Sequence, residues 1–257
     1  TLDLTGGADA TLTHSLTYAG QLITGNGSFN LNGQTLALTS PVTLGSGLIS
    51  GPGEVKITGS GAIEGYLSYS GGALLEDAGT ITQQVYNTFG TFSGDTATIK
   101  VDAGAVYDFT NDNSIGVYNN AGTNGSFINA GLLEKTGSTG GSDLDGNFTS
   151  TGDALTGYLG VAYNTASIGG TLTGNQFNFD QSSSGTFLAG LVLTVATLDV
   201  LNSSILALGT NFDYAGHLEM NTSGTVALNG HALTLGASAS LEGLVTGNGS
   251  VAGGAVV

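Results

Sequence analysis

A short acidic turn carries the side chains of this chain that are best suited to bind a cation. The turn runs from Gly140 to Asn147 and includes Asp143 and Asp145. Calcium takes about six to eight oxygen ligands, many of them carboxylates and carbonyls in flexible loops. Calcium-binding turns of repeat proteins recur in tandem with the order Gly-Gly-x-Gly-x-Asp, whereas this turn occurs once and lacks that order. We therefore favour a solvated turn, with Asp143 and Asp145 as calcium candidates in the alternative, and we expect no other cofactor.

Histidine chemistry is a second possibility, because imidazole is a common zinc ligand and proton carrier. His14, His217 and His231 are spread along the chain, and cysteine is absent from the sequence. His217 and His231 could lie in neighbouring structural repeats, but no obvious trio of carboxylates accompanies them. We expect all three histidines to be ordinary strand or turn residues.

Paired acids could also hydrolyse a glycosidic bond, since that reaction needs two positioned carboxylates. The candidate pairs are Asp143 with Asp145 and Asp108 with Asp112. The Gly-His-Gly and Arg-x-Lys elements of pectinase-like hydrolases are missing, and a strongly negative chain without arginine would repel the acidic sugars that lyases cleave. We therefore expect no enzymatic activity, and a secreted polysaccharide-degrading hydrolase or lyase is the alternative.

The elements that must position these residues are predicted to be short β-strands. Apolar and polar residues alternate repeatedly, as in the segment from Leu12 to Tyr18, and this period of two is typical of strands. The alternating stretches end within a few residues at Gly, Asn, Asp or Ser, which suit turns. Long runs of helix-forming residues are missing. The pattern predicts an all-β chain.

Similar segments return along the chain, which predicts a repeat architecture. The sequence Leu-Ile-Thr-Gly-Asn-Gly-Ser-Phe at 22–29 recurs in related form at 48–55 and 244–251. Residues 125–131 align in the same way with residues 146–152. Coils of about 20 residues, each with two or three short strands, form a parallel β-helix when they are stacked. We expect residues 1–257 to form a single continuous β-helix of about twelve coils.

The middle of the chain, around residues 60–190, is expected to be less regular and rich in aromatic residues. Its tyrosines are Tyr66, Tyr69, Tyr86, Tyr107, Tyr118, Tyr158 and Tyr163. Aromatic side chains on a surface could stack on neutral sugars or bind a protein partner. The interpretation that we favour is a wider core where the coils carry insertions.

The charge balance argues against two classes of partner. The chain has 19 acidic residues, three lysines and no arginine, which gives a formal net charge of -16. Nucleic acids and anionic membranes are bound by clustered basic side chains, so we expect neither as a partner. No apolar run approaches the roughly 18 residues needed to span a bilayer, and the first residues do not resemble a signal peptide. We expect no transmembrane segment.

The Leu-x-Gly-x-Gly-x-Val coils resemble the passenger repeats of bacterial autotransporters and of filamentous-haemagglutinin-like adhesins. Residues 103–153 are also similar to a pattern of large bacterial surface proteins in which Phe-x-Asn-x-Gly recurs once per coil, although Ser150 replaces the second Asn. The resemblance implies a right-handed parallel β-helix, export to the cell surface, and structural or adhesive work. It also implies a surface glycan or a receptor on another cell as a partner.

The two ends of the chain predict self-association. A terminal coil exposes an open strand edge, which isolated solenoids cover with a polar cap, a helix or charged residues. Neither residues 1–7 nor the small, apolar residues 251–257 have that character. Two alternatives follow: flanking coils of a longer chain continue the stack, or copies of this chain join head to tail into a fibre.

Overall fold

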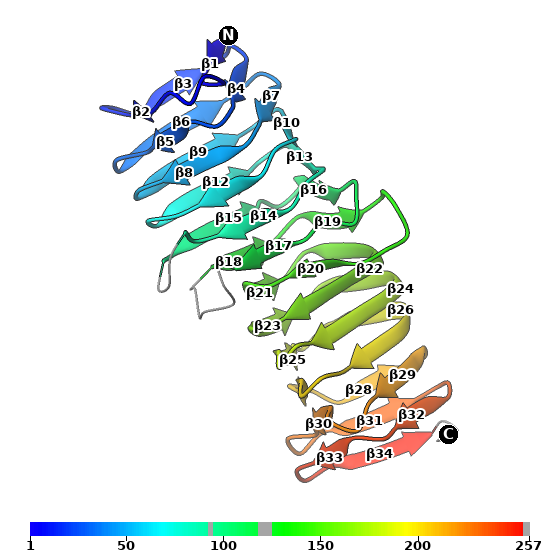
Figure 1. The fold of residues 1–257 in the computed structure, drawn as a ribbon. Helices are drawn as coiled ribbons and strands as arrows, with labels where there is room; N and C mark the ends of the chain where they lie inside the picture. The colour runs from blue at the N-terminus through cyan, green and yellow to red at the C-terminus, as the bar shows by residue number, and fades with distance from the viewer. Residues whose placement is uncertain (92–94, 118–124, 254–257) are drawn as a thin grey trace.

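The structure is a stack of β-strand coils with no helix in the residues that it describes (Figure 1). A computed structural model describes residues 1–91, 95–117 and 125–253, with only the backbone described for residues 117 and 155–158. The prediction of an all-β chain is confirmed. Accordingly, these ranges contain no helix long and apolar enough to cross a membrane.

Each full coil has three faces, and equivalent strands of successive coils pair in parallel. Faces 1 and 2 together form a 19-stranded sheet, and face 3 is a 12-stranded sheet. Face 3 consists of β3 (Leu16–Tyr18), β6 (Gln34–Leu38), β9 (Gly53–Ile57), β12 (Ala73–Asp77), β15 (Ala97–Val101), β18 (Ser126–Asn129), β21 (Asn147–Ser150), β23 (Thr165–Ile168), β25 (Ser184–Phe187), β27 (Ile205–Leu208), β30 (Thr225–Ala227) and β33 (Leu244–Thr246).

Face 1 precedes face 2 within each coil. Face 1 consists of β1 (Leu2–Asp3), β4 (Leu22–Thr24), β7 (Val42–Leu44), β10 (Ser60–Ile63), β13 (Thr80–Gln83), β16 (Val106–Phe109) and β19 (Leu132–Lys135). Face 2 consists of β2 (Ala10–Thr11), β5 (Ser28–Asn30), β8 (Gly47–Ser50), β11 (Leu67–Tyr69), β14 (Asn87–Phe89), β17 (Ile115–Val117), β20 (Ser142–Leu144), β29 (His217–Met220) and β32 (Ala239–Leu241).

Three long strands join these two faces. They are β22 (Asp153–Ala162), β24 (Thr171–Asp180) and β26 (Val192–Val200). The first half of β22 pairs with β19 on face 1, and its second half pairs with β20 on face 2. A separate three-stranded sheet of β28 (Phe212–Tyr214), β31 (Ala232–Leu235) and β34 (Ser250–Gly253) follows in the last coils.

The register of the strands confirms the predicted coil length. Val55 pairs with Leu36 in the preceding coil and with Leu75 in the following one. The two segments that align in sequence, 125–131 and 146–152, also lie in register, because Phe127 pairs with Phe148. Twelve strands stacked at the usual spacing of roughly 4.8 Å make a rod about 50 to 60 Å long. The right-handed sense of the winding stays a prediction.

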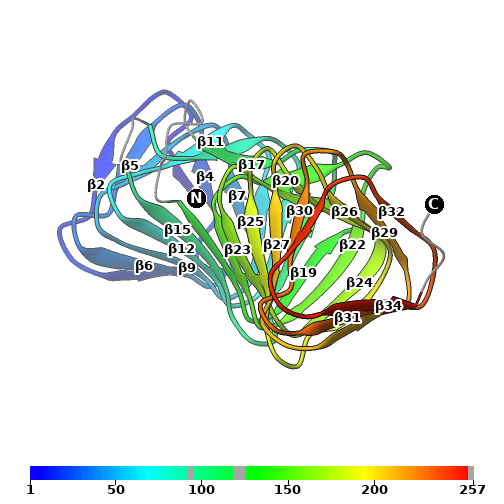
Figure 2. The same cartoon turned by 90° about the horizontal axis from the view of Figure 1, so that it is seen from below.

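Viewed from below, the coils overlap around one interior, with the N-terminal and C-terminal coils displaced sideways (Figure 2). Apolar side chains from all three faces fill this interior. Most of the described aromatic residues of the middle region belong to it, as in the contact of Tyr107 with Phe127, whose ring centroids lie 5.2 Å apart. Tyr66, Tyr86 and Tyr163 are exposed instead. Tyr118 and the side chain of Tyr158 lie outside the described residues.

A polar side chain closes the corner after face 3 in several coils of the middle region. Asn129 Oδ1 accepts a hydrogen bond from the Gly131 amide, 3.2 Å away, and Asp77 does the same for Gly79 at 3.0 Å. Ser150, which replaces Asn in the next coil, accepts a hydrogen bond from Asn129 Nδ2 at 3.1 Å. The Phe-x-Asn-x-Gly pattern is therefore a corner motif that tolerates more than one short polar residue.

Candidate functional site

The acidic turn that the sequence singles out lies on face 2. Asp143 is the central residue of β20, and Asp145 follows that strand directly. Their strand neighbours Ser142 and Leu144 are buried, so the alternation of the strand directs both acids to the outside of the solenoid. Asp143 and Asp145 are themselves only partly exposed. The two interpretations of the turn, a solvated turn and a calcium site at these acids, both stay predictions.

Parallel pairing places Asp143 in a row with residues from the next three coils. Asp143 pairs with Gly160 on β22, Gly160 pairs with Asn178 on β24, and Asn178 pairs with Asp199 on β26. We call this row of Asp143, Gly160, Asn178 and Asp199 the acidic ladder. Its members all lie on the outer surface of face 2.

Three side-chain oxygens of the acidic ladder are buried without a hydrogen-bond partner. They are Asp143 Oδ1, Asn178 Oδ1 and Asp199 Oδ1. Asn178 is 4% exposed and Asp199 is 5% exposed, so these residues are as buried as core side chains although they are on an outer face. A buried acceptor that lacks a donor costs on the order of 1–3 kcal/mol. Three such oxygens in four coils therefore call for an explanation.

Gly160 creates the space in which two of these oxygens meet. A Cβ atom at residue 160 would lie 2.7 Å from Asp143 Oδ1 and closer still to Asn178 Oδ1. Both oxygens thus project over the same point on the outer surface of β22. The third oxygen belongs to Asp199, whose other carboxylate oxygen accepts a hydrogen bond from the Gln176 amide.

Burial shifts the acids of this region toward their neutral forms. It raises the pKa of Asp145 to about 7, with the nearby charge of Asp143 adding to the shift. Burial also raises the pKa of Asp143, helped by the charge of Asp180. The pKa of Asp199 rises by burial too, although the hydrogen bond from Gln176 opposes the rise. Perturbed carboxylates of this kind cluster at functional sites, and they also occur in structural networks.

The three lysines of the chain are committed to ion pairs elsewhere. Lys56 Nζ lies 2.7 Å and Lys100 Nζ lies 2.6 Å from opposite oxygens of Glu76, which stands between them on face 3. The side chain of Lys135 is only 1% exposed, and its Nζ lies 2.7 Å from Asp112 Oδ1. No lysine is therefore left to neutralise the acidic ladder.

The three histidines contact groups that lie near them in the fold. His14 contacts the adjacent Thr13 hydroxyl, and His217 Nδ1 lies 2.9 Å from the carbonyl oxygen of Ser238. The His231 amide donates to the Leu228 carbonyl in a turn. Among the residues that the structure describes, no three His, Cys, Asp or Glu side chains form a group that could hold a metal ion.

The second candidate acid pair, Asp108 with Asp112, has structural partners. Asp108 accepts hydrogen bonds from both the amide and the hydroxyl of Thr136, at 3.1 and 2.7 Å. Asp112 pairs with the buried Lys135. Both acids anchor one coil to the next, and neither is among the oxygens without a partner.

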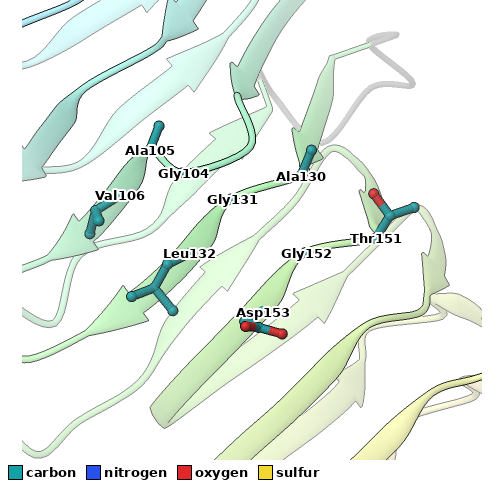
Figure 3. A pocket seen from close by; sticks show the side chains of 9 residues that line it. All are labelled: Gly104, Ala105, Val106, Ala130, Gly131, Leu132, Thr151, Gly152 and Asp153. Carbon is teal, nitrogen blue, oxygen red and sulfur yellow. The ribbon is translucent and has the colours of Figure 1, made fainter.

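A groove of about 520 Å³ crosses three coils where face 3 turns into face 1 (Figure 3). It is lined by Gly104, Ala105, Val106, Ala130, Gly131, Leu132, Thr151, Gly152 and Asp153. The hydroxyl of Thr151 and the carboxylate of Asp153 are its polar side-chain groups, and small residues form most of the rest. Its lining contains one carboxylate, whereas hydrolysis of a glycosidic bond uses two.

An exposed aromatic pair lies at the start of face 2. The rings of Tyr66 and Tyr86 are stacked with centroids 6.0 Å apart, and the Tyr66 hydroxyl donates to Thr88 Oγ1 at 3.3 Å. The Tyr86 ring extends over Gly116, where a Cβ atom would clash with it. Burial, with the charge of Asp145, raises the pKa of Tyr86 to about 12. Tyr86 is therefore close enough to the acidic turn to be affected by the charge of Asp145.

Together, the coils and their parallel registers define the chain as a β-solenoid repeat protein. No protein-family model matches it, and the comparisons with curated proteins and with solved structures find no match either. The likeness to surface-protein passengers is therefore carried by the coil sequences alone.

Sequence reasoning located Asp143 and Asp145 but missed Gly160, Asn178, Asp199 and the burial of Lys135. Asn178 and Asp199 sit in strands whose flanking residues are apolar, as in Phe177-Asn178-Phe179 and Leu198-Asp199-Val200. The acidic ladder could have been predicted from one sequence pattern, a polar residue between two apolar residues that recurs in successive coils.

Proposed function

We propose that this chain is a structural or adhesive β-solenoid segment of a bacterial surface protein, and that it works outside the cell without enzymatic activity. The observation that carries the proposal is the unbroken parallel pairing of face 3 through twelve strands. Such a stack is a stiff spacer, because each coil buries its core against both neighbours.

The outer surface supports this proposal. Its charged residues are overwhelmingly acidic, and the lysines are already paired. A net negative surface keeps a long rod soluble and limits non-specific association. Surface glycans or receptors on other cells are the partners that we propose for it. Cell-surface labelling and a cell-binding assay with the purified chain would test this, and the absence of the chain from the surface of its host would contradict it.

End-to-end association is the more specific version of the proposal. Strands β32, β33 and β34 each pair with a single strand among the described residues, so one edge of each is open. Leu244, on β33, is 59% exposed, and Val251 on β34 is also exposed. Open parallel edges and apolar side chains at the end of a stack favour addition of another coil, either from a longer chain or from another copy.

Sedimentation and electron microscopy of the chain over a range of concentrations would test the association. We expect Leu244→Lys with Val251→Lys to shift the chain toward single rods, because charge on an open edge opposes pairing. Val192→Lys is the matched control, since Val192 is 53% exposed on the side of the rod. Single rods at high concentration for the wild type, or equal effects of the end and side variants, would contradict end-to-end association.

A polysaccharide-degrading enzyme is the second candidate function. The observation in its favour is Asp145, whose pKa of about 7 is that of a group able to donate a proton at neutral pH, close to a second acid and an exposed tyrosine pair. A panel of neutral and acidic polysaccharides, assayed for reducing ends and for unsaturated products, would test it. Turnover that is lost in Asp145→Asn would support this candidate and contradict a purely structural role.

A further inference from the structure

The acidic ladder presents two acceptor oxygens to each other with no donor between them. Asp143 Oδ1 and Asn178 Oδ1 are both buried, both lack a hydrogen-bond partner, and both converge on the space above Gly160. Two oxygens in this arrangement repel one another unless a hydrogen-bond donor or a positive species lies between them. A cation between the two oxygens would satisfy both of them at once.

We propose that a calcium ion binds on face 2 between Asp143 Oδ1 and Asn178 Oδ1, which approach each other because Gly160 has no side chain to keep them apart. A carboxylate and an amide carbonyl are the oxygen ligands that calcium takes in proteins, with water completing its coordination. Asp199, in the next coil, adds a second negative charge at the edge of the site. The ion would join three successive coils across their outer surface.

The residue types at the site favour calcium over other metals. All of the available ligands are oxygens, and neither sulfur nor imidazole lies in the row. Magnesium demands a smaller and more regular octahedral shell, which side chains on separate strands seldom supply. With one direct carboxylate, we expect a dissociation constant of about 0.1 to 1 mM, the range of extracellular calcium modules.

The site modifies the expectation for the acidic turn. Asp145 follows β20 two residues after Asp143, beyond the last pair of the register, Leu144 with Val161, so it stands outside the Gly160 space. In our proposal Asp145 contributes long-range charge, and Asn178 replaces it as the second ligand. The two ligands come from β20 and β24, which belong to different coils, rather than from one loop.

Calcium binding is best measured by isothermal titration calorimetry of the whole chain after removal of metals, together with thermal unfolding in calcium, magnesium or chelator. Because the chain carries a net charge of -16, any divalent cation can stabilise it by screening. The informative comparison is therefore between variants of equal charge. Gly160→Ala displaces the two oxygens without changing the charge, because the three atoms nearest to its Cβ would be side-chain atoms of Asn178 and Asp143.

We expect the wild type to bind one calcium ion, and we expect Gly160→Ala and Asp143→Asn to weaken binding at least tenfold. Asp213→Asn, which removes an exposed charge from another part of the surface, should bind calcium like the wild type. Circular dichroism of each variant in chelator would show that the fold is retained. A wild type that binds no calcium, or a Gly160→Ala variant that binds it equally well, would overturn the proposal.

Asp143→Asn also distinguishes a bound ion from a proton shared by the two oxygens. The asparagine amide can donate to Asn178 Oδ1, so both ideas predict a stable variant in chelator. Only the ion predicts that calcium raises the unfolding temperature of the wild type while leaving that of Asp143→Asn at the level produced by magnesium. Equal responses of the two proteins to calcium and magnesium would contradict the ion.

Discussion

At the scale of single residues, Asp77 shows that a buried carboxylate at a corner of the coil can lower the stability of the fold. Its Oδ1 accepts the Gly79 amide, but its Oδ2 is buried without a partner. Asn129 fills the equivalent corner two coils later and uses both ends of its amide. The interior therefore suits a neutral amide better than a carboxylate at this position.

We predict that Asp77→Asn stabilises the chain at neutral and alkaline pH. Burial raises the pKa of Asp77 from 3.8 to about 6, so the folded chain holds this proton more tightly than the unfolded chain. The contribution of Asp77 to stability is therefore largest below about pH 4 and is lost as the pH rises through about 6. Urea unfolding at pH 8 should show a gain on the order of 2 kcal/mol, which should disappear at pH 4.

The control for this prediction is Asp213→Asn, which removes an exposed acid and leaves the interior unchanged. It should have a small effect at both pH values. A loss of stability in Asp77→Asn at pH 8, or a gain of the same size at pH 4, would show that the buried charge is not the cause.

At the scale of elements, glycine has a second use besides turning the chain. Glycine is expected in turns, and Gly33, with a φ of 78°, is one example. Gly185 instead lies inside β25, where a Cβ would meet the ring of Phe179, with its Cζ atom 2.5 Å away. This glycine makes room for a row of rings in which Phe179 and Phe187 lie 6.1 Å apart.

We predict that Gly185→Ala destabilises the chain by about 1 to 3 kcal/mol, because the added methyl group must displace an aromatic ring in a packed core. Gly6→Ala is the control, since that position has open space around it and lacks a left-handed φ. It should be neutral or slightly stabilising. Equal urea midpoints for the two variants would contradict this prediction, because they would mean that the core around β25 accommodates the methyl group without loss of stability.

At the scale of the whole molecule, stability is distributed along the stack. Each face 3 strand between the two ends pairs with one strand on each side, and the same apolar positions recur in successive coils. A solenoid of this kind behaves as a sum of coil and interface contributions. A coil can therefore be added or removed without loss of the fold.

We predict that removal of residues 34–52 keeps the fold. Gln34 pairs with Gly53, so this deletion takes out one complete coil, and Leu16 can then pair with Val55 in place of Leu36. Circular dichroism should keep its β character, and small-angle scattering should show a rod shorter by roughly 5 Å.

Removal of residues 34–43 alone is the comparison for the coil deletion. This deletion takes out about half a coil, so the strands that follow it no longer lie in register with the strands of the preceding coil. We expect aggregation or a large fall in the unfolding temperature. Equal tolerance of the two deletions would contradict a stack built from whole coils.

Local sequence was sufficient for the class of fold. Alternation around Leu12 to Tyr18 and turn residues such as Asn32 and Gly33 act over a few residues, so they predict strands and corners without knowledge of the rest of the chain. The recurrence of similar segments, such as those that contain Phe127 and Phe148, then predicts the stacking.

Only the tertiary structure decided which side chains from different coils face each other. The step along the chain from Ile99 to its partner Phe127 is much longer than the step from Phe148 to its partner Ala166, so the coils do not share one exact length. An error of one residue in the predicted register of a strand moves each side chain to the opposite side of that strand, and such errors add from coil to coil. The oxygens of Asp143 and Asn178 therefore meet over Gly160 through strand pairing, which the sequence alone does not specify.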